Sequence, residues 1–160
     1  MEIERKFIIN HIPFSLDKYN KHIISQGYLS TDPVLRIRQS DDLFFLTIKS
    51  RGLTERIEVE KEITSDEYKE LSSIVKGNVI SKTRYLIPDG EYTIELDVFQ
   101  ESFEGLIYAE VEFPDIESAS NYKIPEYFGR EVTEEGKYQN SSLSNMKKED
   151  IPEFIRNAIQ

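Results

Sequence analysis

The sequence contains no cysteine, so neither a disulfide framework nor a metal site built on thiolates can form. This absence favours a cytoplasmic protein. No apolar run approaches the length that a membrane span requires, and we expect no secretory leader and no membrane partner. His11 and His22 lack partners at metal-ligand spacing, and we expect surface or packing roles for both.

Positive charge is scarce beside negative charge: 30 acidic and 20 basic residues give a net charge of −10. A broad nucleic-acid or anionic-membrane surface needs exposed Lys and Arg, so we expect neither partner. A small anionic ligand stays compatible with this balance, because bases can gather in one enclosed place while acids cover the exterior. The position of the bases therefore matters more than their number.

Repeats, low-complexity tracts and flexible linkers are also missing, so residues 1–160 are interpreted as one domain with a single sizeable core. Most of the chain alternates polar and apolar residues with period two, which is typical of strands. Turns are expected at Asp41-Asp42, after Arg51-Gly52 and at Pro88-Asp89-Gly90. The predicted strands cover residues 2–9, 34–40, 43–50, 55–63, 79–87, 91–99 and 106–113.

Helices are predicted in three segments, with a shorter one at 116–122. The first lies near 14–25. The second begins at Thr64, where a capping-box pattern includes Glu67, and is expected to stop at Gly77. The third, at about 150–160, has one apolar stripe, and we expect it to pack on the outside of the sheet.

The polar face of almost every predicted strand is fully charged and holds both signs. On any one strand this is most simply a solvated face, whose ion pairs contribute little. The repetition is harder to explain in that way, because a solvated face also tolerates Thr, Ser, Gln and Asn. The residues on this face are Glu2, Glu4, Glu58, Glu60, Glu95, Asp97, Glu110 and Glu112, with Lys6, Arg36, Arg38, Lys49, Arg56, Lys82 and Arg84.

Two architectures could use such a face: an open sheet with helices on its apolar back, or a barrel with the charges inside. About eight strands leave a lumen wide enough for one small ligand. Buried charges need compensation, so such a lumen must be wet or filled by a ligand. Carboxylates suit Mg²⁺ or Mn²⁺, and Arg and Lys suit phosphate, so the lumen is suited to a polyanion with its metal ions.

At this point the chain resembles the CYTH domain family, also called the triphosphate tunnel metalloenzymes. Each matching segment is short, but their order along residues 2–143 is specific. The segments are Glu2-Ile3-Glu4-Arg5-Lys6-Phe7, Gln26-Gly27-Tyr28-Leu29, Leu35-Arg36-Ile37-Arg38, Leu46-Thr47-Ile48-Lys49-Ser50, Arg56-Ile57-Glu58, Lys82-Thr83-Arg84, Glu95-Leu96-Asp97, Glu110-Val111-Glu112-Phe113 and Gly129-Arg130-Glu131-Val132-Thr133.

The resemblance implies an α+β fold: an eight-stranded antiparallel β-barrel with a charged lumen and helices packed outside. It also implies action on triphosphate groups with Mg²⁺ or Mn²⁺, with one or two ions left open. The chain looks most like the compact bacterial inorganic triphosphatases, which cut tripolyphosphate to pyrophosphate and phosphate. Nucleoside triphosphates remain open as further substrates. So do thiamine triphosphate, a class IV adenylyl cyclase activity, a sensor that binds without turnover, and the choice between monomer and homodimer.

The resemblance also implies roles for single residues. The triphosphate is expected to contact Lys6, Arg36, Arg38, Lys49, Arg56, Lys82, Arg84 and, at the tunnel mouth, Lys137. The metal is expected on Glu2, Glu4, Glu60, Asp97, Glu110 and Glu112. The residues expected to act most directly in catalysis are Glu2, Glu4, Lys6, Arg38, Lys49 and Glu58. Glu131 and Thr133 are expected to orient their own segment.

Overall fold

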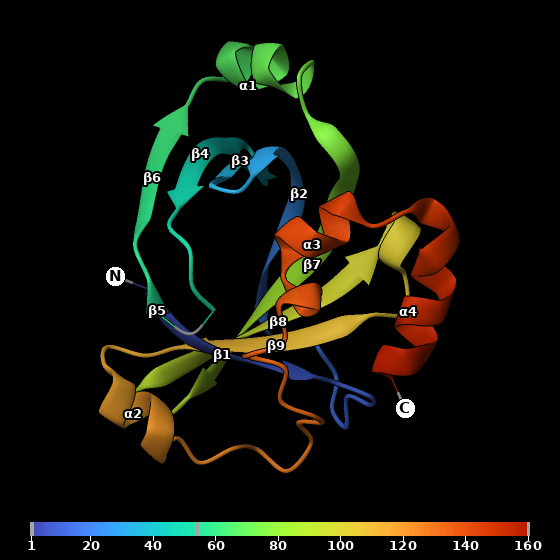
Figure 1. The fold of residues 1–160 in the computed structure, drawn as a ribbon. Helices are drawn as coiled ribbons and strands as arrows, with labels where there is room; N and C mark the ends of the chain where they lie inside the picture. Colours follow the sequence, from blue (N-terminus) through green and yellow to red (C-terminus); the bar gives the residue numbers. More distant parts are fainter. Residues whose placement is uncertain (1, 54, 160) are drawn as a thin grey trace.

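The computed structural model describes residues 2–53 and 55–159; Met1, Thr54 and Gln160, and with them both ends of the predicted domain, lie outside the described residues. One antiparallel sheet has the strand order β5-β1-β9-β8-β7-β2-β3-β4-β6 (Figure 1). Its strands are β1 (Glu2–Ile8), β2 (Asn20–Thr31), β3 (Val34–Ser40), β4 (Leu43–Lys49), β5 (Glu55–Arg56), β6 (Glu58–Ile63), β7 (Lys76–Asp89), β8 (Tyr92–Gln100) and β9 (Ile107–Glu112).

The two edge strands of this sheet, β5 and β6, are consecutive in the sequence. Strands β5 and β6 stand at opposite ends of the order, yet only Ile57 separates them in the sequence. Because β5 pairs with β1 and β6 pairs with β4, this continuous segment joins the edges and the sheet nearly closes. The predicted barrel is thus confirmed and the open-sheet alternative is wrong. Nine strands are counted instead of eight, because the predicted strand 55–63 is interrupted.

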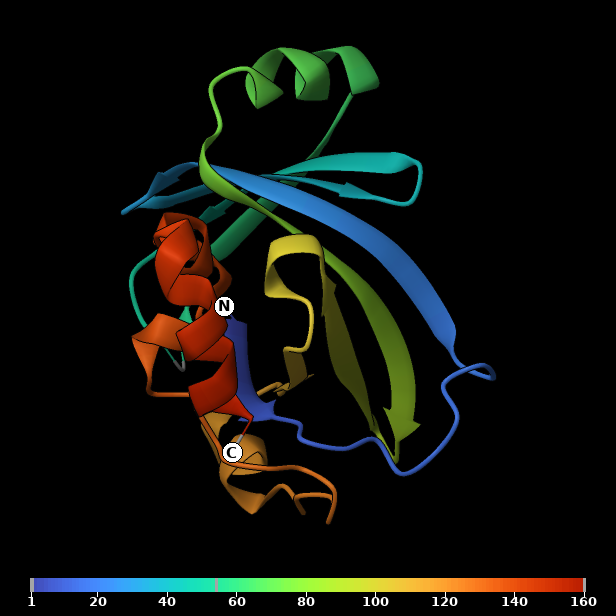
Figure 2. The ribbon, with the colours of Figure 1, turned by 90° about the vertical axis from the view of Figure 1, so that its right-hand side faces the viewer.

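The helices lie outside the strands (Figures 1 and 2). They are α1 (Ser65–Ser72), α2 (Ile116–Asn121), α3 (Asn140–Asn145) and α4 (Ile151–Ala158). The capping box at Thr64 and Glu67 is present, as predicted. The predicted helix end at Gly77 is wrong, because α1 ends at Ser72 and Gly77 belongs to β7. No helix among the described residues is long and apolar enough to cross a membrane.

The helix predicted near 14–25 is wrong. Strand β2 begins at Asn20 and pairs with β3 on one side and β7 on the other. The alternation of polar and apolar residues is hard to recognise in β2. Ile24, Gln26 and Tyr28 share one face of the strand, and Gln26 is polar while the other two are not. That glutamine is fully buried, so polarity in this strand does not indicate exposure.

Two apolar clusters pack the helices and loops against the barrel wall. One packs α4, through Ile151 and Ala158, over wall residues such as Ile80 and Phe99. The other packs Tyr122, just after α2, against Leu96, Val111 and their neighbours. Burying one such side chain contributes roughly 1.5–3 kcal/mol. The second cluster lies on the strand faces opposite the lumen charges. Phe99 of the first cluster is the register partner of Lys82, so this cluster continues the inner face of the barrel beyond the charges.

Helix α3 is fixed on the first residues of β7. The Asn78 side chain donates hydrogen bonds to the carbonyl oxygens of Leu143, at 2.9 Å, and Met146, at 2.8 Å. Gly77 has φ of +72°, and a Cβ atom there would lie 2.1 Å from the carbonyl oxygen of Ser144. Only glycine therefore allows this close approach. The contact brings the start of α3 to one end of the barrel.

Replacing Gly77 with alanine is expected to lower the free energy of unfolding by about 3 kcal/mol, because the Cβ forces β7 and α3 apart. Gly90→Ala is the matched control, since Gly90 has φ of +62° with open space around its Cβ position. That variant is expected to lose only about 1 kcal/mol from the backbone conformation alone. Urea denaturation of both variants measures the difference. Equal losses would show that the contact with α3 does not constrain Gly77.

Candidate active site

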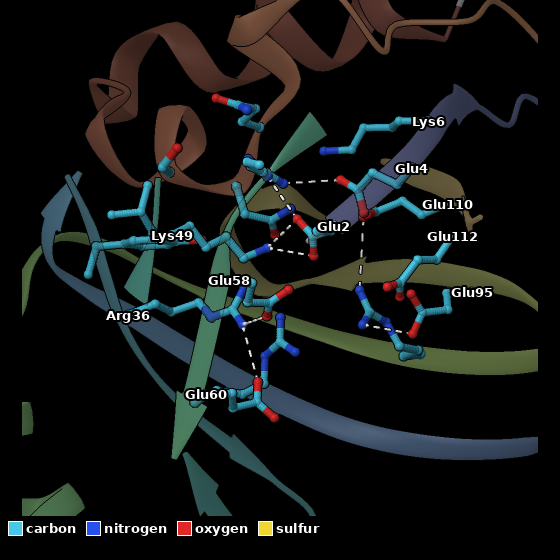
Figure 3. Close-up of a pocket in the computed structure, with 18 of the residues that line it drawn as sticks. Glu2, Glu4, Lys6, Arg36, Lys49, Glu58, Glu60, Glu95, Glu110 and Glu112 are labelled. Atoms are coloured by element: carbon cyan, nitrogen blue, oxygen red, sulfur yellow. Dashed lines mark hydrogen bonds and ion pairs between the residues drawn. The ribbon is translucent and has the colours of Figure 1, made fainter. Parts of the chain in front are cut away.

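The barrel encloses a cavity of about 280 Å³ (Figure 3). All seven of the predicted lumen bases line it, together with seven of the eight predicted acids. The eighth acid, Asp97, is fully buried behind the lining. The other lining residues are Tyr28, Val34, Gln139, Asn140 and Ser141. The interior is therefore a place where fixed charges of both signs converge.

Strand register places these charges opposite one another. On β1 and β9, Glu4 is the partner of Glu112, and Lys6 is the partner of Glu110. Side chains two residues apart on a strand share a face, so all four point inward. Opposed carboxylates such as Glu4 and Glu112 destabilise a sheet unless a proton or a cation separates them. The pairing of β1 with β9 therefore favours a positive charge between Glu4 and Glu112.

Glu2 is the acid most fully satisfied by protein cations. Its carboxylate lies 2.8 Å from Nε of Arg56 and 3.3 Å from Nζ of Lys49. Arg56 also reaches Oε1 of Glu4 at 3.1 Å. Burial opposes the shift, but the hydrogen bond from Glu58 and the charges of Lys49 and Arg56 hold the pKa of Glu2 well below its usual range. Glu2 is therefore ionised at neutral pH.

Asp97 holds two of the lumen cations. Its oxygens lie 2.7 and 2.8 Å from Nε and Nη2 of Arg84, and 2.7 Å from Nζ of Lys82. Asp97 is 0% exposed and Lys82 is 1% exposed. Because both carboxylate oxygens already contact cations, the geometry favours a positioning role. The expected role of Asp97 as a metal ligand stays a prediction.

Two lumen cations have no carboxylate partner among the described residues. Nζ of Lys6 donates to the carbonyl oxygen of Tyr138 at 3.3 Å, and Nε of Arg38 donates to Oε1 of Gln26 at 2.8 Å. Burial, then the charges of Arg36 and Arg84, lowers the pKa of Arg38 to about 9. The charge of Lys6 helps to lower the pKa of its register partner Glu110. Neither Lys6 nor Arg38 is held in a direct ion pair with another described residue, so these two cations are the most available to an anionic ligand.

Two lumen carboxylates, those of Glu4 and Glu58, retain protons near neutral pH because their pKa values are raised. Burial, then the charge of Glu110, raises the pKa of Glu4 to about 8. Burial, then the hydrogen bond with Glu2, raises the pKa of Glu58 to about 7. Burial and the charge of Glu2 also raise the pKa of Glu112. Such protons mark places where the protein supplies too little positive charge.

A divalent cation fits this donor set by its chemistry. Carboxylate oxygens are the ligands that Mg²⁺ and Mn²⁺ prefer, and the opposed pair Glu4 and Glu112 needs positive charge between its members. Within residues 2–53 and 55–159, no three acidic, histidine or cysteine side chains form a ready-made metal site. Water or oxygens of a bound ligand would complete the coordination of an ion held by these acids. The metal roles of the individual acids stay predictions.

The remaining predicted residues divide between the cavity and the surface. Glu60 lines the cavity, accepts a hydrogen bond from Thr47 and lies 3.9 Å from Arg36. Lys137 lies outside the cavity lining, exposed, with Nζ 5.4 Å from the centre of the Tyr138 ring. The structure therefore does not bring it to the cations that line the cavity.

Glu131 and Thr133 lie outside the cavity lining. Glu131 accepts two hydrogen bonds from Arg5 and one from Thr133, which fixes their segment against β1. His22 contacts Asp41 at the surface, 2.7 Å away. Both observations agree with roles outside the chemistry.

Sequence reasoning missed the polar residues that enter the lumen from outside the strands. Gln139, Asn140 and Ser141 line the cavity, and Asn140 accepts a hydrogen bond from Lys82 at 3.2 Å. No strand alternation marks this segment, since it belongs to the start of α3. The sequence feature connected with this segment is Gly77-Asn78 on β7. These two residues contact α3 and so hold it against the barrel.

Comparison with known proteins gives a consistent picture. The CYTH domain model matches residues 1–148. An inorganic triphosphatase of Nitrosomonas europaea is 38% identical, over 89% of this chain and 96% of the relative. An inorganic triphosphatase of Acetivibrio thermocellus is also 38% identical, over 89% of this chain and 92% of the relative. The crystal structure of the inorganic triphosphatase NE1496 is similar with a TM-score of 0.69 and 34% identity, covering 92% of this chain and 96% of that one.

Affinity for Mn²⁺ is expected to fall at least about tenfold between pH 8.5 and pH 6, because protons compete with metal for shared carboxylates. Raised pKa values of about 8 for Glu4 and about 7 for Glu58 mean that both become protonated as the pH falls through this window. Calorimetric titration of the protein with Mn²⁺ measures the effect. In Glu4→Gln the dependence should flatten. A constant affinity in the unmodified protein would contradict a metal site on these groups.

Proposed function

The chain belongs to the CYTH domain family, and from that membership and the charged cavity we propose that it is a metal-dependent inorganic triphosphatase. It would cut tripolyphosphate to pyrophosphate and phosphate. The observation that carries this proposal is the enclosed cavity of about 280 Å³ whose lining includes seven bases and seven acids. That volume is slightly below the roughly 300–1,000 Å³ of pockets for drug-sized ligands, which suits a bare phosphate chain.

The cations divide into two groups with different tasks. Lys6 and Arg38, which have no carboxylate partner among the described residues, can bind phosphate oxygens without giving up an ion pair. Arg84 and Lys82 are held by Asp97, so their positions are set before the substrate arrives. Fixed donors of this kind stabilise the charge that develops on the transferred phosphoryl group.

The acids are proposed to bind the divalent cation and to orient water. Glu2, Glu4 and Glu112 are our first choice for the metal that bridges the phosphates, with Glu110 and Asp97 next. Glu58 and Glu60 would hold a second ion or orient the attacking water. When bound, Mg²⁺ or Mn²⁺ would neutralise phosphate oxygens and lower the pKa of a water molecule. Glu58, with a pKa raised to about 7, is suited to accept a proton near neutral pH.

Three other functions receive less support. An adenylyl cyclase would need a purine pocket, and Tyr28 is the one aromatic residue of the described cavity lining. The Hippeastrum protein HpAC1, described as a putative adenylyl cyclase with a dominant triphosphatase activity, is 19% identical with a TM-score of 0.59, so it supports the fold alone. Thiamine triphosphate would need room beyond the phosphates. A sensor without turnover would not need so many acids.

The wider setting of the activity is also a proposal. We propose a cytoplasmic enzyme because the chain has no cysteine. The substrate class is small and polyanionic, with no role for nucleic acid, since net negative charge opposes a nucleic-acid surface.

The proposed activity predicts rapid phosphate release from tripolyphosphate with Mg²⁺ or Mn²⁺, and slower release from ATP and thiamine triphosphate. A colorimetric phosphate assay on the three substrates measures it. EDTA should abolish release and added metal should restore it. Glu112→Gln should lose at least about 100-fold in kcat while it stays folded, because one metal-binding charge is gone. Turnover that survives chelation would overturn the metal requirement, and release from none of the substrates would overturn the hydrolase.

Arg38→Ala is expected to raise KM and lower kcat for tripolyphosphate, each by about tenfold or more, because a half-buried cation that forms no direct ion pair with the described residues is lost. Lys137→Ala is the matched control, since Lys137 lies outside the cavity lining. It should change both constants less than about twofold. Steady-state kinetics at saturating metal measure both variants. An unchanged KM in Arg38→Ala would place that residue outside the substrate site.

A further inference from the structure

The segment Gln26-Gly27-Tyr28 of β2 has no role in the mechanism described so far. Gln26 and Tyr28 share the inner face of the barrel, where β3 places Arg38 opposite Gln26 and Arg36 opposite Tyr28. Gly27 points outward, and a Cβ atom there would lie 2.7 Å from Cγ1 of Val75. The strand therefore packs tightly on its outer side and presents a polar pair inside.

The hydrogen bonds of this pair have a fixed direction. Nε of Arg38 lies 2.8 Å from Oε1 of Gln26, and Nε2 of Gln26 lies 3.1 Å from the hydroxyl oxygen of Tyr28. An arginine can only donate, so it must face the oxygen of the amide. The amide nitrogen then faces Tyr28 and donates in turn. Tyr28 must accept, because Nε2 of an amide offers hydrogens and no lone pair.

This direction leaves the Tyr28 hydroxyl with one hydrogen to give. Tyr28 lines the cavity, although it is 3% exposed. A phenol carries a single hydrogen, and its oxygen already accepts from Gln26. The chain of donors therefore runs from Arg38 through Gln26 to Tyr28, and its last donor belongs to a residue of the cavity wall.

We propose that the Tyr28 hydroxyl donates a hydrogen bond to a phosphoryl oxygen of the bound polyphosphate, and that Gln26 sets the direction of this donor. Tyr28 is then a substrate-binding residue, and Gln26 is a positioning residue for both Tyr28 and Arg38. The inference rests on the proposed function, since it takes tripolyphosphate as the ligand. It assigns a purpose to a motif whose side chains carry no charge.

The amide at position 26 also suits the charge balance of the site. A carboxylate there would pair with Arg38 and remove one of the two lumen cations that have no acidic partner among the described residues. It would also accept the hydrogen of Tyr28, because an ionised carboxylate has none to give. Glutamine instead holds Arg38 while leaving its charge for the ligand. Tyr28 adds a hydrogen-bond donor beside Arg36 without adding another positive charge to the cavity wall.

The test is a double-mutant cycle on Tyr28→Phe and Gln26→Glu. Tripolyphosphate binding is measured by calorimetry in EDTA, where no turnover occurs, and KM and kcat are measured with metal. Tyr28→Phe should weaken binding about tenfold, as loss of a hydrogen bond to a charged group does. Gln26→Glu should weaken it by more, because Arg38 is also neutralised. In the Gln26→Glu background, Tyr28→Phe should then change binding less than twofold, since its hydrogen already points at the carboxylate.

Controls separate this role from a structural one. Tyr127→Phe removes a buried hydroxyl that has no hydrogen-bond partner among the described residues and lies outside the cavity lining, so its binding should match that of the unmodified protein. Gln26→Met, which neither accepts nor donates a strong hydrogen bond, is the second variant if Gln26→Glu fails to fold. It should weaken binding, and Tyr28→Phe should lose less in its background than in the unmodified protein, because no amide then directs the hydrogen of Tyr28.

The outcomes distinguish this inference from the proposed function. If Tyr28→Phe binds tripolyphosphate within twofold of the unmodified protein, the inference is overturned even when hydrolysis is normal. Equal effects of Tyr28→Phe in the unmodified and Gln26→Glu backgrounds would also overturn it. If the protein binds tripolyphosphate without hydrolysing it, the proposed function fails, but the predicted cycle in EDTA would still support the Tyr28 donor.

Discussion

The structure depends on one constraint: charges enclosed by a barrel wall must be compensated. Fourteen ionisable side chains line a cavity of about 280 Å³, and most are compensated by each other. Asp97 pairs with Lys82 and Arg84, and Glu2 pairs with Lys49 and Arg56. The exceptions are Lys6 and Arg38, which form no direct ion pair within the described part of the chain, and Glu4 and Glu58, whose pKa values are raised by burial.

The same ion pairs close the barrel. Glu2 and Arg56 are register partners in the short β1–β5 ladder, and their side chains meet at 2.8 Å inside it. The two-residue strand β5 could scarcely hold the edge by backbone hydrogen bonds alone. Closure of the wall and assembly of this part of the site are therefore one event. A variant that loses Glu2 would weaken both, so its effect on activity cannot be assigned to chemistry alone.

The sequence predicted the charged strand residues of the site far better than the residues that enter it from other segments. Strand alternation found the fourteen charged lining residues, because period two converts directly into one face of a sheet. It failed at β2, where buried Gln26 obscured the pattern, and at Asn140, which enters from α3. No alternation could show that Lys137 lies outside the cavity lining, since its position follows from how the segment before α3 folds. The interpretation as one domain and the roles of individual acids stay predictions.

Compensation among the lumen charges also implies that metal and phosphate assist each other. In the structure Arg56 is shared by Glu2 and Glu4, so part of its charge is unavailable to a ligand. Under the proposed function, Glu4 would hold a divalent cation, and the guanidinium would then be free to bind phosphate oxygens. The reverse also holds, because phosphate drawn to Arg56 leaves Glu4 available to metal. Coupling of this kind is reciprocal, so each ligand must strengthen binding of the other by the same factor.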